Sequence, residues 1–357
     1  MKPLEKILQA IRPIDPNWMD SARQRQLELT KPPGSLGRLE EIANRCAAIR
    51  ESLQPTASRP RIVLFAADHG VCAEGVSAYP QDVTAQMVLN FLRGGAAINA
   101  FARSGEIDLQ VVDVGITAPL SSSNDLIDSS NNLISRRVRP GTRNFCEEPA
   151  MTEAEMAAAL ETGIELACDS VTAGYDLLGF GEMGIGNTTS ASAIAAALSG
   201  EPVHVVVGSG AGADDACMDR KRSAIQRALA LHADSLADPL DILRCVGGFE
   251  IAAMCGFCLG AASRRVPVVT DGFIATAAAA LAVRLSPAAS GYVFASHRSA
   301  EPGHTHFLAM LNQEPLLDLG MRLGEGTGAA LAMKLIQAAV AAFTGMATFT
   351  GAGVSNK

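Results

Sequence analysis

Aromatic side chains are scarce in this 357-residue sequence: phenylalanine, tyrosine and tryptophan together make up 4% of it, with a single tryptophan. Proteins that bind single-stranded nucleic acid commonly stack the bases on such rings. Basic residues are also few, since 29 lysines and arginines stand against 37 aspartates and glutamates and give a net charge of −8. This balance repels phosphate backbones and anionic lipid surfaces. The composition therefore argues against a nucleic-acid or membrane partner, and an anionic ligand must be held locally.

A secretory leader and long unbroken apolar runs are also missing from the sequence pattern. Glu5, Lys6 and Arg12 interrupt the apolar residues of the opening segment, so it does not have the apolar core of a secretion signal. Arg284, Lys334 and Gln337 break the later apolar stretches, which we therefore expect not to reach the length of a membrane span. These patterns predict a soluble, cytoplasmic protein.

The eight cysteines are scattered, which is untypical of a disulfide framework and fits a reducing compartment. Cys255 and Cys258 form a C-x-x-C pair inside an apolar stretch, and no second pair completes a zinc site. Because free cysteine is commonly buried, we expect both to be inert core residues.

Six short apolar runs end abruptly in glycine or polar residues and are followed by helix-like stretches. Runs that are apolar on both faces and alternate with helices predict an α/β domain, doubly wound, with a mainly parallel six-stranded Rossmann-like sheet. The runs cover residues 61–70, 108–115, 175–182, 203–210, 266–272 and 291–297. Ligands bind beyond the carboxyl ends of such strands. The first candidates are therefore the polar and glycine residues at those ends: Asp68, His69, Asp113, Glu182, Gly208, Ser209, Gly210, Asp271, Ser296 and His297.

The two ends of the chain carry helical patterns and no strand signal, so we expect them to pack together as a small helical domain beside the sheet. The expected division is residues 1–58 for its N-terminal helices, 59–303 for the nucleotide-binding α/β domain, and 304–357 for its C-terminal helices with the catalytic loop. Residues 119–150 are rich in serine, asparagine, arginine and proline and predict a long loop.

Glycine-rich sequence follows two of the predicted strands. In the segment 179–198, alternating glycines lead into Asn187 and an alanine-rich helix, whose first N–H groups and positive dipole end could cradle a phosphate. A second glycine-rich exit, 208–212, leads toward Lys221. The alternative is that the glycines only end the strands. The 179–184 spacing also fits a dinucleotide fingerprint, but Glu201 precedes the next predicted strand instead of ending it, which argues against that function.

Glu325 is the most informative single carboxylate, because it stands between Gly324 and Gly326 immediately before a long helical pattern. An acid at a helix N-terminus can be merely stabilising, by about 0.3–1 kcal/mol. The flanking glycines, however, are poor helix formers that leave space around the side chain. A carboxylate held partly out of water would have a raised pKa and could act as a general base near neutral pH.

Histidines beside other possible ligands suggest a metal only superficially. Asp68 precedes His69, and His304 and His306 are two positions apart, but the sequence supplies no third ligand at a defined spacing. We therefore expect no metal site.

Several strings together resemble the nicotinate-nucleotide–dimethylbenzimidazole phosphoribosyltransferase family. They are KPPGSLGRLE, ADHGV, EGVSAYPQDVT, GEMGIGNTTSA, VGGFE, DGF, SHRSAE and RLGEGTGAALAM, in order from residue 31 to residue 333. The resemblance implies transfer of ribosyl phosphate from nicotinate mononucleotide to dimethylbenzimidazole. The products would be nicotinate and α-ribazole phosphate, for the nucleotide loop of cobalamin. It also implies a homodimer without a metal or organic cofactor.

The same resemblance assigns residues to roles. Glu325 looks like the proton acceptor and Glu182 a second carboxylate that orients the base or sugar. The phosphate and ribose would contact Gly184, Gly186, Asn187, Thr188, Thr189, Gly208, Ser209, Gly210, Gly212, Lys221 and Asp271. The aromatic base would contact Tyr79, Pro80, Gln86, Met87, Leu323 and Gly324. Some members have serine in place of Tyr79 and glutamine in place of Met87, so this chain's preferred acceptor base is open.

Two other functions are considered. A metal-dependent phosphohydrolase would use Asp68, His69 and His297 and would contain a divalent metal. A non-catalytic nucleotide-binding regulator would bind the mononucleotide without releasing nicotinate.

Overall fold

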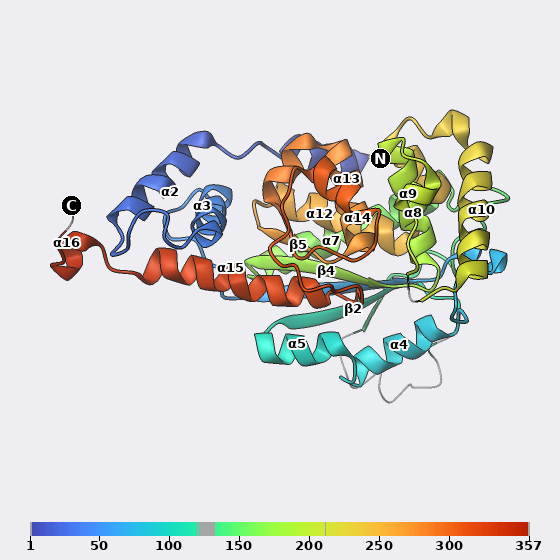
Figure 1. Cartoon of the computed structure of the whole chain (residues 1–357), viewed down its shortest axis with the longest axis horizontal. Coiled ribbons are helices and arrows are strands. Elements are labelled where there is room, and N and C mark those ends of the chain that lie inside the picture. Colours follow the sequence, from blue (N-terminus) through green and yellow to red (C-terminus); the bar gives the residue numbers. More distant parts are fainter. Residues whose placement is uncertain (1, 119, 121–132, 211, 356–357) are drawn as a thin grey trace.

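The computed structural model describes residues 2–118, 120, 133–210 and 212–355. At its centre is a sheet of six parallel strands in the order β3-β2-β1-β4-β5-β6, the strand order of doubly wound nucleotide-binding folds (Figure 1). The strands are β1 (Pro60–Ala67), β2 (Asp108–Gly115), β3 (Leu133–Ser135), β4 (Leu177–Met183), β5 (Val268–Thr270) and β6 (Val293–Ala295). The predicted fold class, an α/β fold with a parallel six-stranded sheet, is confirmed.

One of the six predicted strands is wrong. The valine-rich run in 203–210 forms a single helical turn, α9 (Val203–Val206), which lies outside the sheet. Its buried positions are Val203, Val206 and Val207, spaced three and four residues apart as on one face of a helix. The β-propensity of valine is overridden by this burial pattern. The sixth strand is instead β3, which lies in the 119–150 segment predicted as a loop; residues 119 and 121–132 of that segment lie outside the described residues.

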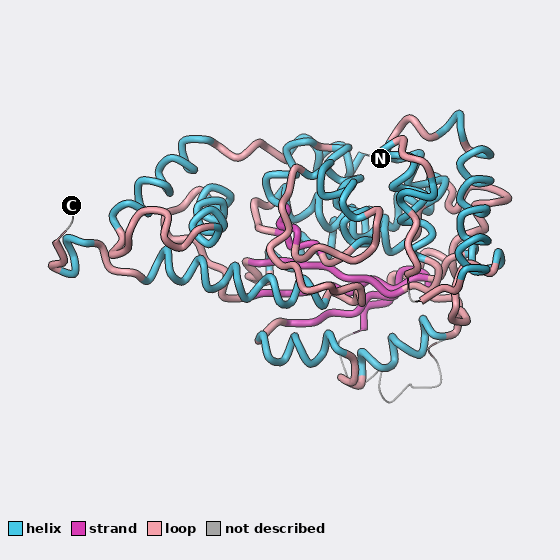
Figure 2. Tube along the Cα trace, viewed as in Figure 1, coloured by secondary structure: helices cyan, strands magenta, loops and turns pink. Residues whose placement is uncertain are grey.

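Helices cover both faces of the sheet (Figures 1 and 2). One face carries α4 (Val83–Leu92), α5 (Ala97–Gly105) and α15 (Thr327–Gly345). The other carries α7 (Glu153–Thr172), α8 (Asn187–Ser199), α12 (Phe249–Ser263) and α13 (Phe273–Leu285). Further helices and 3-10 turns are α1 (Lys2–Ala10), α2 (Pro16–Glu28), α3 (Arg38–Arg50), η1 (Gly70–Glu74), α10 (Asp215–Leu231), η3 (Ala233–Ser235), α11 (Pro239–Val246), η4 (Pro287–Tyr292), α14 (His304–Leu311) and α16 (Phe349–Ala352).

Segments from both ends of the chain meet at one end of the molecule (Figure 1). There α3 packs against α2 and α15, and Leu29 forms an antiparallel bridge with Thr348. The first helix, α1, packs instead on α12 and α7, and α14 packs on α13. The domain boundaries at residues 58 and 303 stay a prediction.

Helix α15 is long and apolar enough to cross a membrane by length and composition, with a mean hydropathy of 1.4. This corrects the expectation that Lys334 and Gln337 break every such stretch. Half of that stretch is buried inside the protein, where α15 packs against α3, α5 and β4. A core helix of a soluble protein can have the same length and apolar composition.

The eight cysteines are free, and Cys255 and Cys258 are fully buried in α12. Burial raises the pKa of Cys258 to about 12 and that of Cys255 well above its ordinary value. A thiol that stays protonated is a poor nucleophile, so the expectation of inert core cysteines is confirmed.

Helices α7 and α12 cross in backbone contact. A Cβ at Gly256 would lie 2.0 Å from the carbonyl oxygen of Leu160, and one at Gly163 would lie 1.8 Å from that of Ala253. Replacing Gly256 by leucine is therefore expected to lower the free energy of unfolding by about 3 kcal/mol, because the helices must separate. Urea unfolding measures the effect. Gly345→Ala is the matched control, since nothing lies near that position and stability should hold or rise slightly. An unchanged urea midpoint for Gly256→Leu would contradict the close crossing.

Candidate active site

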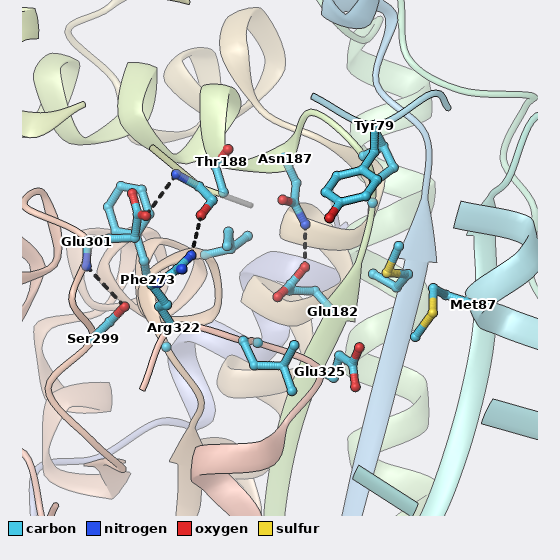
Figure 3. Close-up of a pocket in the computed structure, with 18 of the residues that line it drawn as sticks. Tyr79, Met87, Glu182, Asn187, Thr188, Phe273, Ser299, Glu301, Arg322 and Glu325 are labelled. Atoms are coloured by element: carbon cyan, nitrogen blue, oxygen red, sulfur yellow. Dashed lines mark hydrogen bonds between the residues drawn. The ribbon is translucent and has the colours of Figure 1, made fainter. Parts of the chain in front are cut away.

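A cavity of about 700 Å³ lies beyond the carboxyl end of β4, beside the segments that follow β5 and β6 (Figure 3). Its walls combine three carboxylates with apolar and hydroxyl side chains. The lining residues are Tyr79, Val83, Met87, Glu182, Met183, Gly184, Ile185, Asn187, Thr188, Gly210, Gly272, Phe273, Ile274, His297, Ser299, Glu301, Arg322, Leu323, Gly324 and Glu325. This volume suits a small organic ligand.

Glu325 is held in the cavity by an unusual backbone. Its φ is +63°, and those of Gly324 and Gly326 are +86° and +84°, so three consecutive residues are left-handed just before α15. Residues other than glycine, asparagine and aspartate rarely adopt this left-handed backbone conformation. The flanking glycines make the turn possible, and the turn presents the Glu325 carboxyl group beside Glu182 (Figure 3).

Asp271 accepts hydrogen bonds from backbone N–H groups at the start of α15. Its Oδ2 accepts the N–H of Gly326 at 2.8 Å, and its Oδ1 accepts those of Gly328 at 2.7 Å and Ala329 at 3.3 Å. The first N–H groups of a helix have no partner within the helix, and Gly326 at the N-cap has no side chain to bind them. A carboxylate that follows β5 therefore caps the helix that carries Glu325.

Close glycine packing sets the position of the Glu325 turn against β4. A Cβ at Gly181 would lie 2.3 Å from the Gly326 nitrogen, and one at Gly324 would lie 2.5 Å from Oε1 of Glu182. A larger residue at Gly181 would push the turn away, and one at Gly324 would displace the Glu182 carboxyl group. These two glycines bring the carboxyl groups of Glu182 and Glu325 to one side of the cavity.

The two carboxyl groups hold their protons more tightly than usual. Burial, with the nearby Asp271 charge, raises the pKa of Glu325 to about 7. Burial, with the charges of Asp271, Glu250 and Glu325, raises the pKa of Glu182 to about 8, although a hydrogen bond from Asn187 opposes the shift. Oε2 of Glu325 has no hydrogen-bond partner among the described residues. Glu325 is thus a buried carboxyl group that can change protonation near neutral pH.

The start of α8 and Gly210 form another wall of the cavity, and Gly208 and Lys221 lie behind it. The ammonium group of Lys221 donates to Thr188 Oγ1 at 2.8 Å and to the Gly208 carbonyl at 3.1 Å. Lys221 is almost fully buried, which lowers its pKa to about 8. The N–H of Gly210 donates to Glu301 Oε1 at 2.9 Å, and its carbonyl accepts from Arg322 Nη1 at 3.1 Å. This wall holds two cations and the N-terminus of a 13-residue helix.

The predicted site residues fall into two groups. Those that line the cavity are Tyr79, Met87, Glu182, Gly184, Asn187, Thr188, Gly210, Leu323, Gly324 and Glu325. Those that do not are Pro80, Gln86, Gly186, Thr189, Gly208, Ser209, Gly212, Lys221 and Asp271. Within the second group, Lys221 donates to Thr188 of the cavity wall and to Gly208, and Asp271 accepts the N–H of Gly326 in the turn beside the cavity.

The cavity is also lined by residues that the sequence did not single out for this chemistry, among them Phe273, Ser299, Glu301 and Arg322. Phe273 begins the helix after β5, and Ser299 and Glu301 follow β6. The sequence could have indicated these three residues, because segments that follow parallel strands converge at one edge of the sheet. Arg322 precedes Leu323, and only the tertiary structure places it on the cavity wall, where it donates to the Gly210 carbonyl.

The residues of the alternative metal site each make other contacts, although Asp68 Oδ1 and His297 Nε2 have no hydrogen-bond partner among the described residues and His297 lines the cavity. His69 Nε2 lies 2.6 Å from Glu250 Oε1, and Asp68 accepts the N–H of Thr117. His297 Nδ1 lies 2.9 Å from Ser296 Oγ. His304 binds the N–H of Ser299 and the hydroxyl of Thr276, and burial lowers its pKa to about 3. Across the part of the chain that the structure describes, no three His, Cys, Asp or Glu side chains are grouped to hold a metal ion.

Comparisons with known proteins match this chain over nearly its whole length. The DBI_PRT family model, described as phosphoribosyltransferase, matches residues 11–354. A curated relative from Chloroflexus aggregans named nicotinate-nucleotide–dimethylbenzimidazole phosphoribosyltransferase is 51% identical over 357 residues, 100% of this chain and 99% of that protein. A relative of the same name from Geobacter metallireducens is 51% identical over 351 residues, 98% of each chain.

A solved structure shows the same relationship. The crystal structure of the enzyme of that name from Thermus thermophilus matches with a TM-score of 0.88 and 48% identity, covering 96% of this chain and 100% of that chain. The chain therefore belongs to the nicotinate-nucleotide–dimethylbenzimidazole phosphoribosyltransferase family.

Proposed function

We propose that this protein transfers the phosphoribosyl group of nicotinate mononucleotide to dimethylbenzimidazole, with nicotinate and α-ribazole phosphate as products. The names of its relatives support this reaction. The structural observation that carries the proposal is Glu325, a buried carboxyl group with an unpartnered oxygen and a pKa of about 7 beside a cavity of ligand size.

The reaction needs positioning more than activation of the donor. The pyridine nitrogen of bound nicotinate mononucleotide is cationic, so its bond to the anomeric carbon breaks with the electron pair leaving on nicotinate. A benzimidazole nitrogen attacks that carbon from the opposite face, which converts the β-linked sugar to the α product. Holding the two reactants in line supplies much of the rate enhancement.

Glu325 accepts the proton that the benzimidazole loses. Its ionised carboxylate takes the N–H proton as the new carbon–nitrogen bond forms, so no positive charge accumulates on the product ring. A pKa near the working pH suits a general base, which contributes about 10²- to 10⁴-fold. Glu182, which accepts a hydrogen bond from Asn187, orients the base or sugar beside it.

The remaining lining residues divide by chemistry. Tyr79, Met87, Met183 and Leu323 form an apolar wall that suits the flat acceptor base. Gly184, Thr188 and Gly210 lie on the wall that faces the nucleotide phosphate and ribose, and Lys221 stands behind Thr188.

The protein is proposed to act in the cytoplasm as a homodimer, without a metal or organic cofactor. Tyr79 is 50% exposed and Leu323 57% exposed, although both line the cavity. A second subunit at this rim would remove apolar surface from water.

Mixing the purified protein with nicotinate mononucleotide and dimethylbenzimidazole tests the proposed reaction. We expect free nicotinate and α-ribazole phosphate in equal amounts, both measured by chromatography. No nicotinate should appear when the benzimidazole is omitted. Binding of the mononucleotide without release of nicotinate would indicate the regulator instead. Release of inorganic phosphate that a chelator abolishes would indicate the phosphohydrolase.

A further inference from the structure

Two buried ionisable side chains, His69 and Glu250, take no part in the chemistry described above. His69 follows β1 and is 1% exposed, and Glu250 lies in the first turn of α12 and is 0% exposed. Nε2 of His69 lies 2.6 Å from Oε1 of Glu250, while Oε2 of Glu250 has no hydrogen-bond partner among the described residues. Because taking such groups out of water is costly, their placement needs a physical explanation.

Hydrogen bonds assign the protons on the His69 ring. The hydroxyl of Ser190 donates its one proton to the carbonyl of Gly247 at 3.0 Å, and Ser190 Oγ lies 3.2 Å from Nδ1 of His69. Nδ1 therefore carries a proton and donates it to Ser190. A second proton lies between Nε2 and Glu250. The ring is thus held at both of its nitrogens, which sets its orientation.

Ser190 connects this pair to the cavity wall. It lies in the first turn of α8, the helix that begins at Asn187, and the side-chain amide of Asn187 donates to Oε2 of Glu182 in the cavity (Figure 3). Gly186 at the N-cap of α8 has no side chain to fix the start of the helix. The hydrogen bond from His69 to Ser190 therefore anchors the turn that carries Asn187.

The ring also packs against the glycines on either side of it. A Cβ at Gly184 would lie 3.4 Å from Nε2 of His69, and one at Gly186 would lie 3.4 Å from the His69 Cβ. A Cβ at Gly248, the residue before α12, would lie 2.3 Å from Cε1 of the ring. The enclosed ring has little room to rotate, so it can hold the start of α8 at a fixed distance from α12.

We propose that Glu250, His69 and Ser190 form a positioning chain that holds the start of α8, so that Asn187 keeps Glu182 in place at the cavity. This inference rests on the proposed function and adds positioning residues to it. None of the three chain members lines the cavity, so they act through Asn187 and not on a reactant. The competing assignment is purely structural: the chain would stabilise the fold and leave the turnover of each folded molecule unchanged.

Substitutions cut or preserve the chain at defined points. Ser190→Ala removes the hydroxyl that joins the ring to α8, and His69→Gln keeps a donor toward Glu250 but has no nitrogen at the position of Nδ1. Glu250→Leu cannot bond Nε2, whereas Glu250→Gln can. His232→Gln is the matched control, since His232 is also buried, with Nε2 2.9 Å from the Phe145 carbonyl, but does not line the cavity.

Turnover is measured with nicotinate mononucleotide and dimethylbenzimidazole, well below the thermal unfolding midpoint of each variant. We expect kcat to fall about 10- to 100-fold in Ser190→Ala, His69→Gln and Glu250→Leu, since a misplacement of about 1 Å can reduce a rate about 10²-fold. Glu250→Gln should recover most of the activity that Glu250→Leu loses, and His232→Gln should match the wild type. In an Asn187→Ala background, Ser190→Ala should cause no further fall, because its effect passes through Asn187.

Hydrogen–deuterium exchange of residues 184–190 gives a readout that needs no turnover. Exchange of these amides should be faster in Ser190→Ala and His69→Gln than in the wild type, and unchanged in His232→Gln. Unchanged exchange in Ser190→Ala and His69→Gln would show that the chain does not hold the start of α8.

Other kinetic outcomes also overturn the inference. A normal kcat in Ser190→Ala and His69→Gln, with only the unfolding midpoint lowered, would make the chain purely structural. A further fall on adding Ser190→Ala to Asn187→Ala would show that Ser190 does not act through Asn187. Absent turnover in the wild type contradicts only the proposed reaction, and the exchange measurement then decides whether the chain positions α8.

Discussion

Replacing Glu325 by glutamine is expected to lower kcat by about 10²- to 10⁴-fold, the contribution of a general base. Glutamine has nearly the same shape and cannot accept the benzimidazole proton. Because no direct contact of Glu325 with the donor phosphate is required, nicotinate mononucleotide should still bind. Steady-state kinetics and calorimetric titration of the mononucleotide measure both effects. Near-normal turnover in Glu325→Gln would remove Glu325 from the chemistry.

The pH dependence provides an independent check on the same group. Burial raises the pKa of Glu325 to about 7, so below that pH the carboxyl group is protonated and cannot accept a proton. In the wild type, kcat/KM should fall about tenfold per unit below pH 7, since this ratio reports the free enzyme. The residual activity of Glu325→Gln should lack this break. Glu182 and Lys221, whose pKa values are about 8, would add separate breaks at higher pH. Glu314→Gln, at an exposed carboxyl outside the cavity, is the control and should leave the profile unchanged.

Replacing Asp271 by alanine is expected to reduce both stability and turnover. The change removes the acceptor for the N–H groups of Gly326 and Gly328, and hydrogen bonds to a charged group contribute about 1.5–3 kcal/mol each. We expect the free energy of unfolding to fall by about 3–5 kcal/mol. The Glu325 turn should also lose its fixed position, and a misplacement of about 1 Å can reduce the rate about 10²-fold. Urea unfolding and kcat measure the two effects.

Asp176→Ala is the matched control for this prediction. Asp176 also accepts backbone N–H groups, those of Ser58 at 3.1 Å and Arg59 at 2.8 Å, but it precedes β4 and lies at the opposite end of the sheet. Its loss should reduce stability and leave kcat unchanged. If Asp176→Ala and Asp271→Ala lowered kcat equally, the fall would reflect general destabilisation. A kcat equal to that of the wild type in Asp271→Ala would show that the cap does not position Glu325.

Residue pattern alone predicted five of the six strands, because strands buried on both faces must be apolar throughout and end in turn residues. It did not predict that the 203–207 run would turn into a helix, since valine favours strands and only the tertiary burial of Val203, Val206 and Val207 favours the helical spacing. The short strand β3 was missed because three residues in a polar segment carry too little local signal.

The sequence determined which chemical groups are available at the candidate site, namely the Glu325 carboxyl group between glycines and the glycines before α8. It also indicated the family, through short motifs that occur in a fixed order along the chain. Only the tertiary structure decided which side chains meet. Glu182 and Asp271 lie at the ends of parallel strands, and the turn before α15 brings Glu325 to the same edge of the sheet. There burial and neighbouring carboxylates, Asp271 above all, raise the pKa values of Glu182 and Glu325. The capping role of Asp271 and the attachment of Arg322 to Gly210 were likewise decided by three-dimensional packing, because hydrogen bonds between distant segments leave no periodic pattern in a sequence.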